Sequence, residues 1–90
     1  MVDVTAELIE IGVRYFAAAG AAAGSEAEQL TVPAGTTVGG LVDELSGRSP
    51  GLARVLLRCS YLCDGVAVRD TTQALRTGNT VDVLPPFAGG

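Results

Sequence analysis

Apolar and polar residues alternate over residues 9–16, which is the periodicity of a half-buried β-strand. The face predicted to be buried carries Ile9, Ile11, Val13 and Tyr15. Phe16 is the exception, because it is an aromatic residue on the otherwise polar face. Two interpretations of Phe16 stay open: the next segment covers it, or it is left exposed for a partner.

The next segments predict a loop, a short strand and a helix. Residues 17–25 are rich in Ala and Gly and are expected to form a loop with at most one loose helical turn. Leu30 and Val32 share one face of a short strand that Pro33 ends, because proline cannot donate a ladder hydrogen bond. The helix has an apolar stripe at the spacing of a core-facing surface, formed by Val38, Leu41, Val42 and Leu45.

Small and capping residues mark this helix. Either Thr36 or Thr37 suits its N-cap, and Gly47 is expected to end it in a left-handed conformation. Gly39 and Gly40 each cost about 1 kcal/mol in helix propensity relative to Ala. We therefore expect these two glycines to allow close packing of the helix on the sheet.

The second half of the chain predicts one more helix and three strands. Ser49-Pro50 is a helix start, with an N-cap followed by proline, and this helix should run to about Leu57. The expected elements that follow are a strand over Cys59–Cys63, the hairpin turn Asp64-Gly65, a strand over Val66–Val68, a single helical or 3₁₀ turn over Thr71–Leu75, the turn Gly78-Asn79 and a strand with Val81 and Val83. This order describes one α+β domain with helices on one face of the sheet.

The charge of the chain narrows the function classes. The net charge is −4, with six Arg, no Lys and no His. The Arg residues are scattered, which argues against nucleic acid, because phosphate binding needs a clustered basic face. The absence of His removes the commonest general base and metal ligand, so a self-sufficient hydrolase is disfavoured. The acidic body suits a partner with a basic docking surface.

Hydropathy and cysteine content add three expectations. No apolar run reaches the roughly 18 residues needed to span a bilayer, and the start lacks a signal-peptide pattern, so we expect a cytoplasmic protein that binds no membrane. Cys59 and Cys63 on one strand would lie about 13 Å apart, too far for a disulfide, and two thiols without His are too few for a structural zinc site. We expect both to be small core or half-buried residues, with a redox or sulfur-relay role as the alternative.

The chain ends with Pro85-Pro86-Phe87-Ala88-Gly89-Gly90, directly after the last predicted strand. Two prolines favour an extended, semi-rigid segment, and Phe87 offers an apolar anchor for a partner. Gly89 and Gly90 have no side chains, so they can thread a narrow channel that receives the terminal carboxylate. We expect residues 1–84 to form the domain and residues 85–90 to form a flexible tail whose working group is the carboxylate of Gly90.

Several segments resemble a known family. They are Val13 to Ala17, Val32 to Val38, Leu41 to Leu45, Asp64-Gly65, Gly78 to Val81, and the tail from Leu84 to Gly90. Together they are similar to the small subunit of molybdopterin synthase, within the wider β-grasp sulfur-carrier group that also includes the thiazole-biosynthesis carrier. The segment Ala18-Ala19-Gly20-Ala21 departs from the pattern, because charged residues often stand there in the family.

The resemblance implies a ubiquitin-like, five-stranded β-grasp fold and no cofactor bound by this chain. It implies that an adenylating enzyme uses ATP to activate Gly90, that a sulfur donor protein loads it as a thiocarboxylate, and that Gly89 lines the channel. The loaded tail would then supply the dithiolene sulfurs of molybdopterin inside a larger catalytic subunit. Candidates for partner contact are Phe16, Pro86, Phe87 and Ala88.

Three alternatives stay open beside this prediction. The sulfur acceptor can instead be a thiazole, cysteine or a tRNA base. The chain can be a protein modifier that forms isopeptide bonds, although the lack of Lys excludes self-chains through lysine. It can also be a plain β-grasp interaction module whose Gly-Gly end is incidental.

Overall fold

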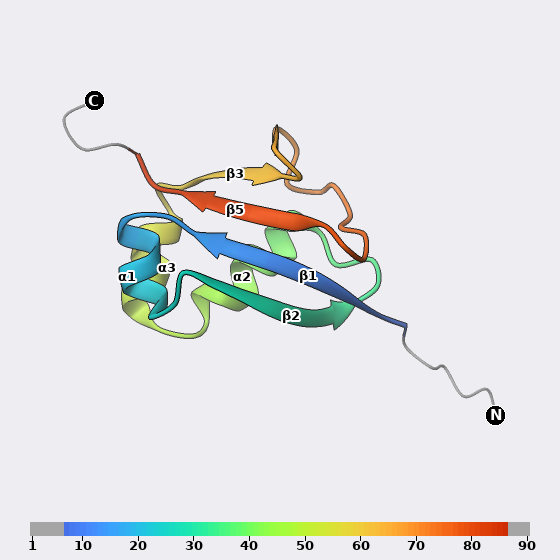
Figure 1. Cartoon of the computed structure of the whole chain (residues 1–90), viewed down its shortest axis with the longest axis horizontal. Helices are drawn as coiled ribbons and strands as arrows, with labels where there is room; N and C mark the ends of the chain where they lie inside the picture. Colours follow the sequence, from blue (N-terminus) through green and yellow to red (C-terminus); the bar gives the residue numbers. More distant parts are fainter. Residues whose placement is uncertain (1–6, 87–90) are drawn as a thin grey trace.

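The computed structural model describes residues 7–86, which form a five-stranded sheet and three helices (Figure 1). The strands are β1 (Leu8–Tyr15), β2 (Ala27–Pro33), β3 (Ser60–Cys63), β4 (Val66–Ala67) and β5 (Thr80–Leu84). The helices are α1 (Ala18–Ala23), α2 (Val38–Ser46) and α3 (Pro50–Leu56).

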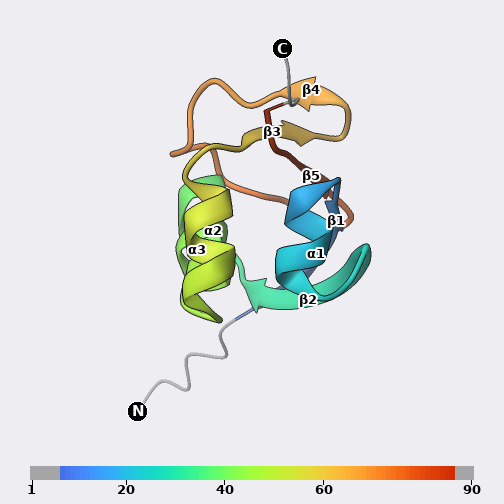
Figure 2. The ribbon, with the colours of Figure 1, turned by 90° about the vertical axis from the view of Figure 1, so that its left-hand side faces the viewer.

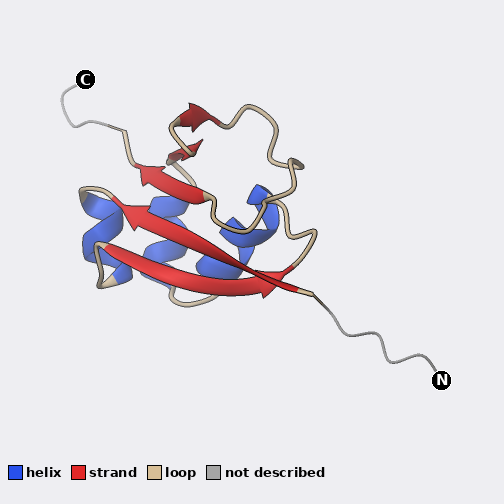
Figure 3. Cartoon of the chain, turned by 45° about the vertical axis from the view of Figure 1, so that its right-hand side comes forward, coloured by secondary structure: helices blue, strands red, loops and turns tan. Residues whose placement is uncertain are grey.

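The sheet has the order β2-β1-β5-β3-β4, so the strand that comes last in the sequence lies in the middle. β5 pairs parallel with β1 and antiparallel with β3, whereas β1–β2 and β3–β4 are antiparallel hairpins. Figures 2 and 3 show the sheet curving around the helices, which lie on one of its faces. This confirms the predicted α+β, ubiquitin-like β-grasp fold with a mixed sheet.

The core lies between the sheet and the helices, as the alternation predicts. On β1, Ile11 and Val13 are fully buried, and on β5 Val83 is fully buried as well. Six more large residues that are almost fully buried come from three further elements, β2, α2 and α3: Val32, Val38, Leu41, Leu45, Leu52 and Leu56. Two buried strands at the centre of the sheet therefore anchor the segment that leads to the C-terminus.

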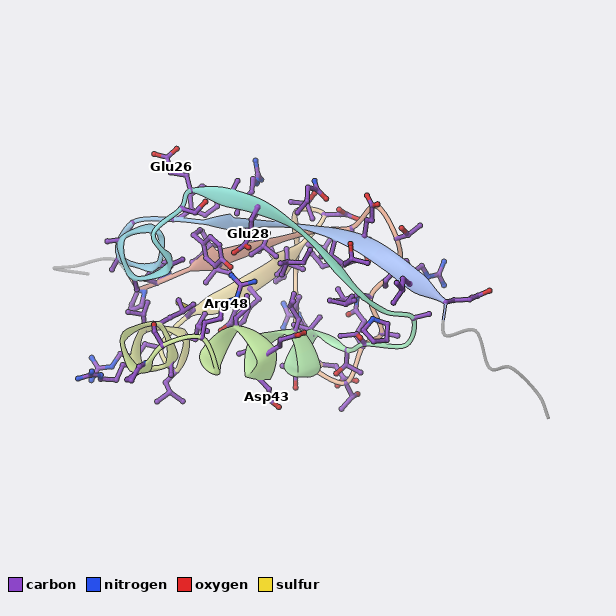
Figure 4. All side chains as sticks on the ribbon, turned by 90° about the horizontal axis from the view of Figure 1, so that it is seen from below. Glu26, Glu28, Asp43 and Arg48 are labelled. Carbon is purple, nitrogen blue, oxygen red and sulfur yellow. The ribbon has the colours of Figure 1, made fainter. Side chains whose placement is uncertain are left out.

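The two longer helices begin at the predicted caps. The Thr37 hydroxyl accepts a hydrogen bond from the Gly40 backbone N–H at 3.0 Å, and the Ser49 hydroxyl accepts one from Leu52 N–H at 3.1 Å. Their apolar stripes face the sheet, which lies above both helices in Figure 4. α3 ends at Leu56, close to the predicted end.

The glycines of α2 behave differently from the prediction. Gly47 is not left-handed, since its φ is −71°, and its N–H bonds back to Asp43 and Glu44 carbonyls in a tightened last turn. Gly39 approaches the Thr71 backbone, whose carbonyl accepts its N–H at 2.8 Å, and a Cβ on Gly39 would lie 3.3 Å from that oxygen. The close contact is thus with the loop before β5, and the expected packing of the glycines on the sheet is wrong.

Residues 17–25, predicted as a loop with at most one loose helical turn, contain the six-residue helix α1. Ala19 is fully buried in the core, and Gly24 ends the helix in the left-handed conformation with its N–H bonded to the Gly20 carbonyl at 2.9 Å. The helix exists because the sheet and α3 offer its small residues a packing surface, although the residues carry no amphipathic pattern.

The segment before β5 is more extended than predicted. Residues 71–72 form a turn, closed by the Asp70 carboxylate on the Thr72 N–H and hydroxyl, and no helix follows. Ala74 instead forms a β-bridge with Thr37. β3 begins at Ser60 and β4 ends at Ala67, one residue inside the predicted limits.

The tail lies mostly outside the described residues. β5 ends at Leu84, and Pro85 and Pro86 follow without regular secondary structure. Phe87, Ala88, Gly89 and Gly90 lie outside the described part of the chain, so the division into residues 1–84 and 85–90 stays a prediction. None of the helices within residues 7–86 is long and apolar enough to cross a membrane.

Candidate functional site

The base of the tail, where Leu84 of β5 leads into Pro85, lies at the centre of the sheet. The Val83 carbonyl accepts a hydrogen bond from the Phe16 N–H at 3.1 Å, and Leu84 lies opposite Ser60 of β3. β5 is therefore paired on both sides up to Val83 and with β3 alone at Leu84, the residue before Pro85. The predicted site residues that the structure describes are Phe16 and Pro86, and both lie at this end of the sheet.

Phe16 is partly exposed, so the next segment does not cover it fully, and its role in partner contact stays a prediction. The side chain is 39% exposed, directly after the last residue of β1. The Arg14 guanidinium lies over its ring, with Cζ 5.6 Å from the ring centroid. This distance is within the range of a cation–π contact, which orients the ring without covering it. Phe16 is thus an aromatic residue available to a partner beside the start of the tail.

A strained turn follows Phe16. Ala17 has φ 51° and ψ −127°, a conformation that side chains with a Cβ rarely adopt. The turn is closed by a hydrogen bond of 3.0 Å from the Ala19 N–H to the Phe16 carbonyl. α1 has no side-chain cap at its N-terminus. The turn fixes the direction in which Phe16 leaves the sheet.

An open hollow lies between the end of β1, α1 and the start of β2. It has a volume of about 810 Å³, and its lining includes Phe16, Ala17, Gly20, Ala21 and Gly24. The hollow exists because α1 contributes only Ala and Gly residues to the lining, and these residues have a small side chain or none. Charged residues lie at its edge, namely Arg14 and Glu26. A shallow, mostly apolar hollow beside an exposed aromatic side chain is suited to a protein partner more than to a small substrate.

An ion pair crosses the two central strands on the face away from the helices. Arg14 donates from Nε and Nη2 to the two Asp82 carboxylate oxygens at 2.7 and 2.8 Å. The Asp82 side chain is only 6% exposed, whereas that of Arg14 is 57% exposed. The hydrogen bonds and charge of Asp82 raise the pKa of Arg14, so the guanidinium stays charged. The pair fixes this cation beside Phe16.

Sequence analysis missed this pair, although a signal existed. Arg14 and Asp82 both fall on outward-facing positions of their strands. The pairing of β1 with β5 puts them directly opposite each other, 68 residues apart in the chain. Only the strand order, which local patterns do not contain, brings them together.

A second polar network ties the same end of the sheet to the helices. The Tyr15 hydroxyl and Arg48 Nη1 both donate to Glu28 Oε2, at 2.6 and 2.7 Å (Figure 4). Burial of the ring and the bond to Glu28 raise the pKa of Tyr15. Burial opposes ionisation of Glu28, but the hydrogen bonds from Arg48 and Tyr15 outweigh it and lower the pKa of this carboxyl. Glu28 is thus an anion held between two donors.

Neither cysteine has the environment of a reactive thiol. Cys63 is buried, and the half-buried Cys59 donates its S–H to the Val55 carbonyl, with Sγ 3.2 Å from the oxygen. Burial raises the pKa of both thiols, which keeps them protonated near neutral pH. The structure confirms the interpretation as core or half-buried residues. Within residues 7–86, no cluster of His, Cys, Asp and Glu side chains is grouped as a metal site would require.

Comparison with known sequences identifies one matching family. The sequence profile of the ThiS family matches residues 13–90, which includes the last strand and the Gly-Gly end. No protein of curated function matches the sequence significantly.

Solved structures share the fold over nearly the whole chain. The HVO 2177 protein of Haloferax volcanii is 29% identical, with a TM-score of 0.84, and the match covers 100% of this chain and 94% of that protein. The small archaeal modifier protein SAMP1 of the same organism is 28% identical, with a TM-score of 0.77 and coverages of 90% and 99%. A chain in the complex of subunits 1 and 2 of the molybdopterin-converting factor from Helicobacter pylori is 20% identical, with a TM-score of 0.68 and coverages of 91% and 100%. This last likeness concerns the fold alone.

Proposed function

Because the chain belongs to the ThiS family of ubiquitin-like sulfur carriers, we propose that it carries sulfur as a thiocarboxylate on Gly90 and delivers it for the dithiolene of molybdopterin. The observation that carries this proposal is the family match that runs through to the Gly-Gly end, on a fold whose central strand leads directly into that end. The chain is the sulfur-carrying subunit, and the reactions are catalysed by its partner proteins.

The chemistry explains why the chain needs no catalytic group of its own. An adenylating enzyme joins the Gly90 carboxylate to the AMP part of ATP and releases pyrophosphate. A sulfide sulfur from a donor protein then attacks the carbonyl carbon, a C–S bond forms, and the C–O bond to AMP breaks. The thiocarboxylate sulfur then attacks an acceptor carbon and displaces an oxygen leaving group from that carbon. Water hydrolyses the resulting thioester, so the sulfur stays on the acceptor and the carboxylate is regenerated.

The described residues support docking at the base of this tail. Phe16, the hollow beside it and the Arg14 cation lie around the end of β5. A larger subunit that receives Gly89 and Gly90 in its active site would cover this end of the sheet. Phe87, Ala88 and Pro86 would then lie at the entrance of the channel.

Reconstitution tests the acceptor. The loaded protein, the large subunit of molybdopterin synthase and its pterin precursor are expected to yield molybdopterin, and deletion of Gly90 should abolish it. Full activity of the shortened chain, or sulfur transfer to thiazole, cysteine or tRNA enzymes alone, would refute the molybdopterin assignment.

A modifier function is the second candidate, because the chain is 28% identical to SAMP1, a protein named as a modifier. It would join Gly90 to amino groups of other proteins. Denaturing gels of cell extract would then show conjugates of high mass that disappear when Gly90 is deleted. Their absence, together with molybdopterin formation, would favour the carrier.

A further inference from the structure

The segment at the C-terminal end of α3 exposes one large apolar side chain between two cations. Leu57 is 85% exposed, more than any other large hydrophobic residue that the structure describes. Arg54 and Arg58 flank it and are exposed as well. We call these three residues the α3 ridge. Its positive charge contrasts with the net charge of −4 of the whole chain.

The two arginines of the ridge lie at and beyond the end of α3. Arg54 is in the last turn of the helix, whereas Arg58 stands two residues after its last residue, Leu56. Within residues 7–86, the ion pairs involve Arg14 and Arg48 and neither arginine of the ridge. A cation in the last turn complements the helix dipole, but this accounts neither for a second cation nor for the exposed Leu57.

The α3 ridge lies next to the base of the tail. Only Cys59 separates Arg58 from Ser60, which pairs with Leu84, the last residue of β5. Figure 1 shows the end of α3 and the start of β3 at the same end of the molecule as the end of β5. Phe16 and its hollow flank β5 on the β1 side, whereas the ridge flanks it on the β3 side.

We propose that the α3 ridge docks an acidic segment with an apolar pocket on the enzyme that adenylates Gly90. The charge complementarity sets the chemistry of the segment, because two unpaired guanidinium groups favour carboxylates around a pocket for Leu57. The proposal rests on the proposed function. Adenylation is the step shared by every sulfur acceptor and by the modifier alternative, so this enzyme is the partner to which we commit.

Steady-state kinetics of ATP–pyrophosphate exchange, with the adenylating enzyme of the same organism and the full chain, test the ridge. We expect R54Q/R58Q to raise the KM for the carrier about fivefold at unchanged kcat, because exposed charges act on encounter and binding. The KM of this variant should also depend less on NaCl than that of the wild type. L57A should raise the same KM about fivefold, through lost apolar burial.

Controls exist at the end of the sheet where β5 begins. R76Q removes the charge of an exposed arginine there, and V66A shortens another exposed apolar side chain, which is 69% exposed. Both should leave the KM for the carrier unchanged. Thermal unfolding of each variant checks that the fold is intact.

Three results would overturn the proposal in distinguishable ways. Equal KM values for the ridge and control variants would remove the ridge as a docking surface. A change in the KM for ATP alone would assign the arginines to nucleotide contact. If the wild type supports no exchange and gains no sulfur, the proposed function fails, and the ridge proposal fails with it.

Discussion

The two ends of the central strand pair β1–β5 are built differently. At the end where β5 begins, side-chain hydrogen bonds hold the turns around residues 64–65 and 76–79. The Asp64 carboxylate accepts hydrogen bonds from the Thr80 N–H at 2.8 Å and from Asn79 Nδ2 at 2.6 Å. The Asn79 side-chain oxygen in turn accepts from the Arg76 N–H at 2.7 Å. The residues there are those that the turn geometry requires, with Gly65 and Gly78 at positive φ.

The end where β5 finishes has the opposite character. Ala17 takes a strained conformation that Gly would adopt more readily, and α1 begins without a side-chain cap. Phe16 and Leu57 expose large apolar surfaces to solvent. The strained turn and the exposed apolar side chains at this end lower the stability of the fold around the base of the tail. The comparison shows that hydrogen-bonded turn residues stabilise one end of the fold, whereas the other end combines a strained turn with the surface at which we propose partner contact.

The largest effect that we expect concerns the end where β5 begins. D64A removes two hydrogen bonds and puts Ala at φ 50°, so the free energy of unfolding should fall by about 2 kcal/mol. D64N keeps an acceptor for the Thr80 N–H and a side chain that tolerates this conformation, and should lose less than half as much. Urea unfolding of both variants measures the difference, and equal losses would show that the hydrogen-bond network is not what stabilises this end.

At the tail end we expect a substitution to stabilise the protein. A17G relieves strain of about 1–3 kcal/mol and adds backbone entropy to the unfolded chain, for a net gain of about 1 kcal/mol. A21G in the helix that follows, α1, is the control and should instead destabilise by about 0.5–1 kcal/mol. If A17G also destabilises, the turn after Phe16 is not strained and the contrast between the ends is lost.

The smallest effect that we expect concerns Glu28, whose carboxylate accepts hydrogen bonds from Tyr15 and Arg48 at the end where β5 finishes. Its pKa lies below the ordinary value of 4.5, so the ionised carboxylate stabilises the fold at neutral pH, and this contribution is lost as the pH falls through the lowered pKa. E28Q should therefore be less stable than the wild type by under about 1 kcal/mol at pH 7, and the gap should close in acid.

Glu26 provides the control for this pH dependence. Its carboxylate is exposed and makes none of the hydrogen bonds of the Tyr15–Glu28–Arg48 network (Figure 4). E26Q should leave the wild-type pH profile of urea unfolding unchanged. A gap between E28Q and the wild type that persists at acid pH would contradict the assignment to the Glu28 charge.

Local signals in the sequence predicted most of the fold. Alternation identified β1, hydroxyl caps at Thr37 and Ser49 identified the two longer helices, and Asp64-Gly65 identified the hairpin. Each of these signals acts within a few residues of the chain. The fold class followed from their order together with the family resemblance.

The features that escaped prediction depend on contacts distant in sequence. α1 is stabilised by burial of Ala19 in a core built from other elements, so its own residues carry no helical pattern. The Arg14–Asp82 pair and the approach of Gly39 to Thr71 likewise arise from strand order and loop packing. Of the candidate site, the place of Phe16 in the pattern left its exposure open, and the structure shows it partly exposed. The roles of Phe16, Pro86, Phe87, Ala88, Gly89 and Gly90 stay predictions.

The central claim is that Gly90 carries sulfur, and intact-mass spectrometry tests it most directly. The full chain is incubated with ATP, the adenylating enzyme and a sulfide donor, with the Gly90 deletion as control. The account predicts a mass gain that corresponds to one oxygen replaced by one sulfur, dependent on ATP and absent from the shortened chain. An unchanged mass, under conditions in which the same enzyme loads another carrier, would contradict it.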